Sequence, residues 1–472
     1  KLAKRTISSV DIDNFNDRMA RFAPQLHLPI GDNPDSGMAI QFTQLDDFHP
    51  DELYQNLGLF QELKDIRGRL MDPETFPQAA SELRQEAQPL EKLAKSNTDT
   101  ASDNEPTSEE DDASIFDRLL GGQISEDTKA PTHIRNTLPE TLIRQYARDI
   151  VRPYTVPKAD PFQPQYVAAV DQAISEQMRV VLHHPDFQAM EALWRSVYGM
   201  ITSVETDRDL RIYLLDITRD ELAEDIRAAQ GQLEDSELYR LLVEKSTGAP
   251  GSDPWSLLVG DYTFTTEEND LSLLAALGAI GSQAGSPFLA AADASFLGCQ
   301  SVVETPDPRD WKLKNTETEN AWQNLRQSSV APWIGLAHPR ILLRMPYGKD
   351  SDPLDYFEFE ELRHQREHES YLWGNSAFAC AMLIAIAFQM KGWSMEPGDY
   401  LDVENLPAHI FEEDGESQMM ACAEEFLTER AASAMLDRGL MPMMSYRNRD
   451  AVRLMRFQSI AEPLTALAGS WA

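Results

Sequence analysis

The chain has 472 residues, 42% of them hydrophobic, which is enough for two to four domains or for one large α/β body with a sizeable core. Its 42 basic and 78 acidic side chains give a formal net charge of −36, which argues against nucleic-acid and anionic-membrane binding because both depend on cationic contacts. Three widely spaced cysteines without a CxxC pair predict neither a zinc site nor a disulfide framework, and they favour a reducing compartment.

Residues 1–95 are interpreted as a small α/β segment. TISSVDIDNF at 6–15 alternates like a strand, and in MAIQFTQL at 38–45 the side chains of Ile40 and Phe42 share one face. One long amphipathic helix follows, with Pro50 at its first position and Pro73 at its end. We expect its apolar face to join this segment to the rest of the chain; that face consists of Leu53, Leu57, Phe60, Leu63, Ile66 and Leu70.

Residues 96–113 are predicted to be a flexible acidic linker. TDTASDNEPTSEEDD at 98–112 carries seven acidic residues and no basic one, so it offers little apolar surface to offset the entropy of ordering. We interpret it as a solvated spacer without a binding role of its own.

Residues 114–164 are predicted to form a helical and proline-rich connector. SIFDRLLGG, at 114–122, has the pattern of a short amphipathic helix. Its apolar face is the candidate partner-binding site, with Ile115, Phe116, Leu119 and Leu120. Two interpretations stay open: the helix binds a groove of another protein, or it docks on its own domain. Prolines at 153, 157, 161 and 164 predict an extended stretch.

Residues 165–472 show the pattern of a helix-covered, mostly parallel sheet, the α/β class. Two helical patterns at 167–181 and 187–201 precede predicted strands at 210–217, 256–260, 287–292 and 441–445. Capping boxes are expected at 218–221 and 265–268, and a further helix runs through Met435. The longest apolar run, twelve residues at 377–388, is too short for the roughly 20 residues of a membrane span, so it predicts a buried core helix instead.

One motif raises an enzymatic alternative. His364, Glu367 and His368 satisfy the H-x-x-E-H spelling, and two imidazoles four residues apart on a helix can bind zinc beside a glutamate base. A zinc-dependent hydrolase is therefore the alternative function, although a solvated charged surface is the favoured interpretation in so charged a segment. No phosphate-binding loop or nucleophile elbow is present, and Gly278, Gly281 and Gly285 fit close helix packing better than dinucleotide binding. We expect no catalysis and no cofactor.

An ordered series of motifs in 165–472 resembles the large subunit of the type VI secretion contractile sheath, the TssC family. The motifs are HHPDFQAMEALWRSVYGMI, LRIYLLDITRDEL, DPWSLLVGDYTF, SPFLAAADASFLG, PRILLRMPYG, YLWGNSAFA and LPAHIFEEDGE. VDIDNFNDRMARFAPQLHL and LDDFHPDEL, in 1–95, resemble the companion small subunit, TssB. The resemblance implies a contractile-sheath fold and a small-subunit-like segment fused to a large-subunit-like body.

The resemblance also implies partners. Sheath proteins of this family form TssB/TssC heterodimers that polymerise in the bacterial cytoplasm around a tube of Hcp protein, and the sheath docks at the membrane-anchored apparatus through its baseplate. SIFDRLL matches in place the helix that the disassembly ATPase ClpV recognises in some members, with Phe116 in place of the usual leucine. Relative to the family, the first segment starts late and the body ends before a further C-terminal segment. In the family those extensions carry arms that pair with strands of neighbouring protomers. The resemblance therefore implies one of two roles: a sheath subunit, or an accessory that does not propagate the sheath. Such an accessory would act at a sheath end, at the baseplate or in regulating assembly.

Overall fold

The structure is a computed structural model that describes residues 2–30, 33–83, 143, 146–147, 150–151, 163–247, 253–312, 316–363, 367–413 and 415–471. The chain divides into two compact units. The larger comprises residues 1–24, 42–48 and 179–472, and the smaller comprises residues 25–41 and 49–178. The first 48 residues therefore contribute to both units.

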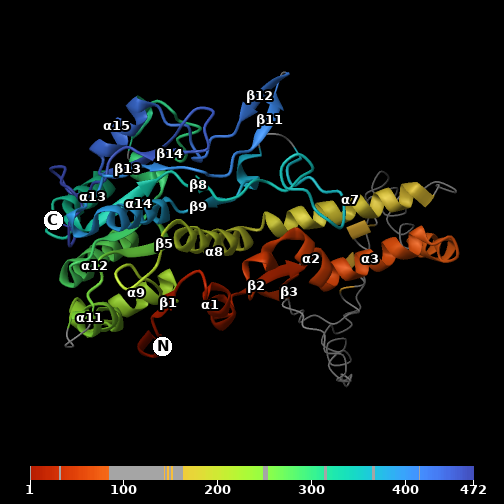
Figure 1. Cartoon of the computed structure of the whole chain (residues 1–472), viewed down its shortest axis with the longest axis horizontal. Coiled ribbons are helices and arrows are strands. Elements are labelled where there is room, and N and C mark those ends of the chain that lie inside the picture. Colours follow the sequence, from red (N-terminus) through yellow and green to blue (C-terminus); the bar gives the residue numbers. More distant parts are fainter. Residues whose placement is uncertain are drawn as a thin grey trace, which may run out of the picture. The chain divides into compact units, whose positions relative to one another are not determined.

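The larger unit is built on a six-stranded sheet in the order β10-β14-β13-β7-β6-β5 (Figure 1). Its strands are β5 (Leu258–Phe264), β6 (Phe288–Ala292), β7 (Ile334–His338), β10 (Asp402–Val403), β13 (Leu440–Ser445) and β14 (Val452–Leu454). The pairs β5/β6, β6/β7 and β7/β13 are parallel, whereas β13/β14 and β14/β10 are antiparallel. The prediction of a mostly parallel sheet is confirmed, with an antiparallel edge added.

Helices cover both faces of this sheet, so every residue of β6 and β7 is buried. On β6, Phe288 and Ala290 belong to the core under α12 (Glu268–Ala284), α13 (Thr316–Arg326) and α15 (Glu429–Asp437). Leu289, between them, belongs to the core under α14 (Ser376–Lys391). The twofold alternation of a strand thus divides the two cores.

The predicted core helix is α14. Asn375 caps its N-terminus by accepting a hydrogen bond from the Ala377 N–H at 2.9 Å. Its buried residues pack against the sheet, while Met390 and the following Trp393 are exposed. By length and composition this is the one helix among the described residues that could cross a membrane, and half of that stretch is buried inside the protein. The burial supports a core helix, although the last turn is exposed instead of buried on all sides.

Helices α8 (Pro185–Ser203) and α9 (Arg219–Ala228) lie where the sequence pattern predicts helices. Three others were not predicted: α1 (Phe15–Phe22), α10 (Glu237–Tyr239) and α11 (Lys245–Thr247). Of the strand expected at 6–15, only Ser8–Val10 is extended in a sheet. The capping box of Thr218 and Glu221 is present, as predicted. The one expected at 265–268 is wrong: Glu267 is the N-cap, and Thr265 bonds through its N–H and its hydroxyl to the buried Asp270 instead.

Two short sheets and a hairpin complete the larger unit. They are β1 (Ser8–Val10) with β4 (Ile212–Leu214), β8 (Ile341–Leu342) with β9 (Trp373–Gly374), and β11 (Ile410–Glu413) with β12 (Glu416–Met419). The strand expected at 210–217 is therefore shorter than predicted and lies outside the main sheet. The strand expected at 441–445 is not the final one, because β14 follows it.

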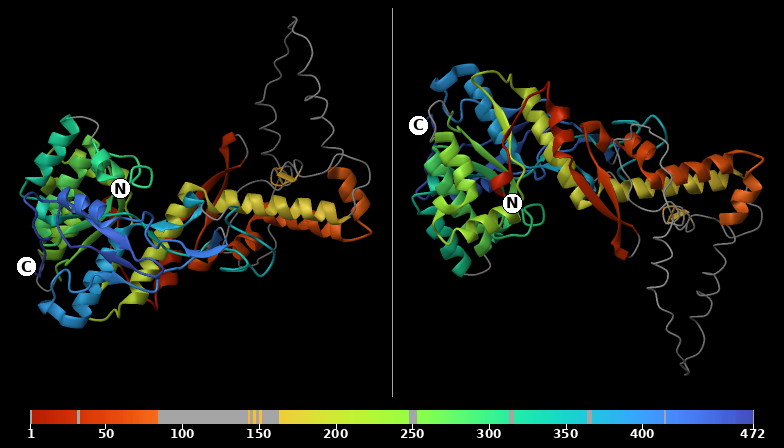
Figure 2. Two further views of the ribbon diagram at one scale, coloured as in Figure 1. Left: turned by 90° about the horizontal axis from the view of Figure 1, so that it is seen from above. Right: turned by 90° about the horizontal axis from the view of Figure 1, so that it is seen from below.

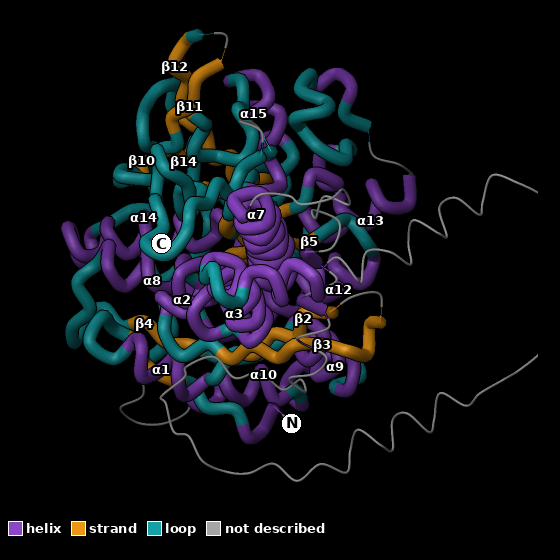
Figure 3. Tube along the Cα trace, turned by 90° about the vertical axis from the view of Figure 1, so that its right-hand side faces the viewer, coloured by secondary structure: helices purple, strands orange, loops and turns teal. Residues whose placement is uncertain are grey.

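The smaller unit contains the hairpin of β2 (Gln25–Ile30) and β3 (Asn33–Gln41), shown in Figure 3, and the helices α2 (Pro50–Asn56) and α3 (Gly58–Met71). Helix α7 (Gln163–Leu182) supplies residues up to Met178. The two views of Figure 2 show α3 alongside α7. Arg67 binds Asp171 with Nε to Oδ1 at 2.5 Å, and the Gln163 amide donates to the Leu70 carbonyl at 2.8 Å.

The single long amphipathic helix predicted after Pro50 is wrong. Leu57 is extended, with φ −76° and ψ 129°, so it ends α2 and also begins α3. Its N–H still bonds to the Leu53 carbonyl at 2.9 Å, and its carbonyl accepts from Gln61 at 3.0 Å, so the break leaves neither group unsatisfied. The six residues of the predicted face are all buried despite the break.

Two glycines of α12 permit close packing. A Cβ on Gly281 would lie 2.6 Å from the Ser286 carbonyl oxygen, and one on Gly278 would lie 2.6 Å from Ile334 on β7. Gly285 ends the helix in the left-handed region, with φ +71°. Close packing, as expected, accounts for Gly278 and Gly281, but not for Gly285, where a Cβ would have no atom within 4 Å.

Candidate assembly interface

The N-terminal segment adds a strand to the body of the larger unit. In the antiparallel pair of β1 and β4, Ser8 lies opposite Leu214 and Val10 opposite Ile212. Just before β1, Arg5 forms ion pairs with Asp216 and with Glu221, the latter at 3.1 Å. Residues more than 200 positions apart are thus joined by main-chain pairing and by charge.

Aromatic side chains continue this contact beyond the strand. Phe15, at the start of α1, is buried and meets Trp194 and Tyr198 of α8 edge to face, with ring centroids 5.8 and 5.3 Å apart. Met19, one turn further along α1, is fully buried. The VDIDNF and WRSVY motifs therefore meet in one apolar contact.

A second aromatic cluster joins residues 42–48 to the start of α8. The rings of Phe42 and Phe48 stack at 4.1 Å, and both meet Phe187 edge to face at 5.9 and 5.6 Å. Asp47 holds the turn between them, because its Oδ2 accepts from the Thr43 N–H at 2.6 Å. All three rings are fully buried, so the two motifs share one core.

A buried ionic cluster ties α8 to the PRILLRMPYG segment. The Arg344 guanidinium binds Glu191 of α8, with Nε to Oε1 at 2.8 Å, and Glu361, with Nη1 to Oε2 at 2.7 Å. Arg195 donates to the same Glu191 oxygen at 2.7 Å, and the Tyr347 N–H donates to Glu361 at 2.7 Å. Both carboxylates are completely buried, so their charges depend on these partners.

The electrostatics of this cluster follow from its geometry. Burial alone would raise the pKa of Glu361, but the charge of Arg344 and the hydrogen bonds to the carboxylate hold it at about 2. His183 contributes as well, since its Nε2 lies 3.5 Å from Oε1 of Glu361. The pKa of Arg344 is raised well above its ordinary value: burial lowers it, and the two carboxylates outweigh that effect. Glu361 and Arg344 are therefore both ionised at neutral pH.

A second buried pair lies where β7 ends. His338 points Nδ1 at the Ala292 carbonyl, 2.9 Å away, and Nε2 at Oε2 of Glu425, 3.0 Å away. Burial alone would lower the pKa of His338, but Glu425 and the Ala292 carbonyl outweigh it and raise that pKa. Because a carboxylate oxygen and a carbonyl oxygen are both hydrogen-bond acceptors, a doubly protonated His338 ring satisfies both contacts. The other oxygen of Glu425 accepts from the Val302 N–H at 3.2 Å.

Of the three candidate zinc ligands, the structure describes Glu367 and His368, and among the described residues these two belong to no metal site. His364 lies outside the described residues, and Glu367 precedes a 3₁₀ turn, η9 (His368–Ser370), in place of a continuous helix. The His368 ring stacks on Trp373, and its Nε2 lies 3.3 Å from the Glu424 carbonyl oxygen. In the described part of the chain no three histidine, cysteine or acidic side chains are grouped so that they could hold a metal ion. The hydrolase alternative has no support here.

The partner-binding face predicted at 114–120 also lies outside the described residues. In contrast, sequence reasoning missed Arg344, Glu191 and Glu361. A signal was available for Arg344, since it is the one charge in the apolar run ILLRMP. Its acidic partners come from segments 153 and 17 residues away, so no local pattern could have identified them.

Comparison with known proteins identifies the family of both parts of the chain. Residues 164–461 match the family model of the EvpB/VC_A0108 tail sheath N-terminal domain (VipB), and residues 1–101 match the model described as type VI secretion system, VipA, VC_A0107 or Hcp2. The type VI secretion system sheath protein TssC1 of Pseudomonas aeruginosa is 31% identical over 381 residues, which cover 79% of this chain and 75% of that protein. The chain therefore belongs to the type VI secretion sheath protein family, with a VipA-type segment fused to a VipB-type domain.

Proposed function

We propose that this sheath-type protein is a single-chain protomer with the contractile-sheath fold, in which a small-subunit-like segment, 1–95, binds a large-subunit-like body, 165–472, within one chain. Residues 96–113 act as the linker and residues 114–164 as the connector. The observation that carries this proposal is the pairing of β1 with β4, because it joins the two family-like parts through main-chain hydrogen bonds.

Two further features support the same function. The contacts of Phe15 with Trp194 and of Phe42 with Phe187 are apolar and buried, as in a permanent interface. In the smaller unit, Arg67 and Asp171 bring together residues from the two family-like parts. We therefore assign to the buried face of α2 and α3 the role of joining the two segments.

The test is to separate the two parts without unfolding either. A protease site inserted at 100–110 of the full chain is cleaved, and the products are passed over a size-exclusion column. We expect both fragments to elute together, because the contacts do not depend on the linker. Adding Phe15→Ala and Trp194→Ala should shift part of the N-terminal fragment to separate elution, because the change removes one of the contacts that hold the two fragments together. Separate elution of the two fragments from the otherwise native chain would contradict the proposal.

The sheath family implies assembly with other sheath subunits. Beyond that, we propose the Hcp tube, the baseplate and a ClpV-type ATPase as partners, with the protein in the bacterial cytoplasm or docked at the apparatus, and with a structural and not an enzymatic role. Packing of α14 against the sheet supports a core role for that helix, not membrane insertion.

Binding of the ATPase is assigned to residues 114–120. Replacing Ile115, Phe116, Leu119 and Leu120 with serine should abolish binding to ClpV, as measured by fluorescence anisotropy with the full chain. Replacing Ser114 and Asp117 with alanine serves as a control, because neither belongs to the apolar face that the sequence predicts. An unchanged affinity of the four-serine variant would remove this assignment.

A further inference from the structure

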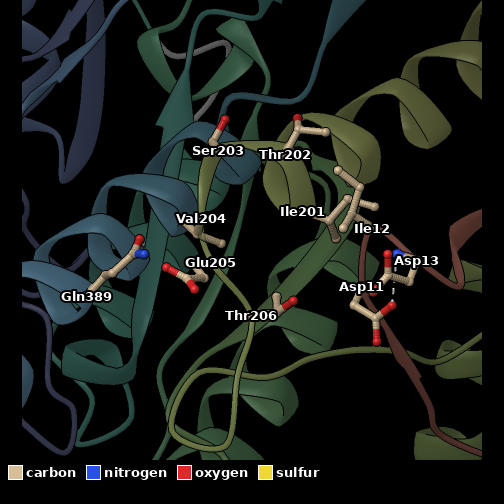
Figure 4. Close-up of a pocket in the computed structure, with 10 residues that line it drawn as sticks. All are labelled: Asp11, Ile12, Asp13, Ile201, Thr202, Ser203, Val204, Glu205, Thr206 and Gln389. Carbon is tan, nitrogen blue, oxygen red and sulfur yellow. Dashed lines mark hydrogen bonds between the residues drawn. The ribbon is translucent and has the colours of Figure 1, made fainter.

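The larger unit has a groove beside its N-terminal segment (Figure 4). It is lined by Asp11, Ile12 and Asp13, by residues 201–206 where α8 ends, and by Gln389 of α14. Its volume is about 410 Å³, within the range of pockets that hold ligands or side chains. We call it the N-terminal groove.

Carboxylates give this groove a negative rim. Asp11 is engaged locally, because its carboxylate accepts from the Asn14 side-chain amide at 2.7 Å and from the Asn14 N–H at 3.0 Å. Asp13 and Glu205 are exposed, and within the described ranges neither carboxylate has an ion pair. The carboxylates of Asp13 and Glu205 are therefore available to bind a cationic group of another molecule.

Exposed apolar side chains occur in the groove lining and at positions close to lining residues along the chain. Ile12 in its lining is 58% exposed, and Met390 and Trp393, just after Gln389, are 66% and 62% exposed. Tyr198, one turn before Ile201 on α8, is 40% exposed. Arginine combines the two chemistries offered here, since its guanidinium binds carboxylates and stacks on aromatic rings.

The chain itself carries an arginine-rich hairpin. Residues 447–456, RNRDAVRLMR, connect β13 to β14 and continue past β14, with four arginines and one acidic residue in a chain whose net charge is −36. Arg449 pairs with Glu404, and Arg453 pairs with Asp402 at 2.9 Å. Arg447 and Arg456 are exposed, and neither has an ion pair among the described residues.

We propose that the N-terminal groove of one copy receives the 447–456 hairpin of a second copy, with Arg447 and Arg456 facing Asp13 and Glu205. The inference rests on the proposed role as an assembling sheath component. Because the groove and the hairpin are different surfaces, the contact is head to tail, and repetition of such a contact yields a ring or a filament. The contact also supplies a local electrostatic attraction between two copies whose net charge of −36 otherwise makes them repel each other.

The test uses charge reversal in the full chain, with self-association measured by sedimentation velocity over a concentration series near 0.15 M salt. The groove variant is Asp13→Lys with Glu205→Lys, and the hairpin variant is Arg447→Glu with Arg456→Glu. We expect each variant alone to associate about tenfold or more weakly than the unaltered chain. A one-to-one mixture should recover association, because each variant then meets a complementary partner.

A matched control variant separates the effect of charge at the groove from the effect of the net charge of the chain. Glu234→Lys with Glu304→Lys changes two exposed residues outside the groove and alters the net charge as much as the groove variant does, so its association should stay close to that of the unaltered chain. If the charge-reversed groove variant fails to fold, the neutral variant Asp13→Asn with Glu205→Gln replaces it. We expect the neutral variant to weaken association less than charge reversal does.

Three results would overturn the inference: a monomeric unaltered chain, groove variants that associate as it does, or a mixture that recovers nothing. None of them affects the linker-cleavage test, which depends only on contacts within one copy, so failure here is distinguishable from failure of the proposed function.

Discussion

Replacing Glu361 with glutamine should destabilise the larger unit, because the change removes one of the two buried carboxylates that neutralise Arg344 while preserving the shape of the side chain. The Arg344 guanidinium would remain buried with only Glu191 to balance it. A buried charge that loses part of its compensation is among the few changes with large effects on the free energy of unfolding.

Two estimates of the magnitude agree. A carboxyl whose pKa is 4.5 when unfolded and about 2 when folded contributes about 3 kcal/mol to stability at neutral pH. Removal of one partner from a buried ion pair costs about 3–5 kcal/mol. We therefore expect Glu361→Gln to lower the free energy of unfolding by about 3 kcal/mol at pH 7.

The contribution of Glu361 to stability should depend on pH in one direction. Because the folded pKa of Glu361 lies below the unfolded one, its stabilisation is present above pH 4.5 and declines as the pH falls towards 2. Urea unfolding followed by tryptophan fluorescence at pH 7, 4 and 3 should show the difference in the free energy of unfolding between the two proteins narrowing, from about 3 kcal/mol at pH 7 to about 1.5 kcal/mol at pH 3. Glu358→Gln is the control, since this exposed neighbour should change stability by less than about 0.5 kcal/mol. Equal stability of the Glu361 variant and the unaltered chain at pH 7 would refute the reasoning.

Three other changes test separate parts of the account. The pKa of His338 is raised in the folded state, so protonated His338 stabilises the fold fully below pH 6.5, and this contribution is lost as the pH rises through the folded pKa. Urea unfolding from pH 6 to 9 should therefore show a fall in the free energy of unfolding that the His338→Gln variant lacks. Phe15→Ala should cost about 3–5 kcal/mol in the same assay, because the ring is buried against Trp194; a cost below 1 kcal/mol would contradict the packing. Gly281→Ala should lower the melting temperature, since its Cβ would meet a backbone oxygen at 2.6 Å, whereas Gly199→Ala on α8, with open space around it, should raise it slightly; the reverse order would contradict the close approach.

Much of the larger unit could be predicted because its elements carry local signals. The strand at 287–292 was predicted from an apolar run, and β6 occupies Phe288–Ala292. Helix α8 begins at Pro185 after His184, which caps it as an N-terminal signal should. Strand β7 was missed because its five residues are followed at once by Pro339, which made the segment resemble a loop.

The features that define the candidate interface could not be predicted, because they depend on distant segments. Nothing in SSV at 8–10 identifies IYL at 212–214 as its partner, since pairing register is settled by packing and not by propensity. The break at Leu57 has a similar cause: the heptad-like spacing continues through it, and only the extended backbone at Leu57 reveals two helices. The resemblance of ordered motifs identified the family where local chemistry could not.

The central claim, that this chain is a working sheath component, is tested most directly by negative-stain microscopy of the purified full chain, alone and mixed with Hcp and authentic sheath subunits. The account predicts that the chain is built into assemblies, either as tubes of its own or as density on sheaths formed by the other subunits. Sheaths that form normally beside an unbound chain, with no tubes from the chain alone, would contradict it.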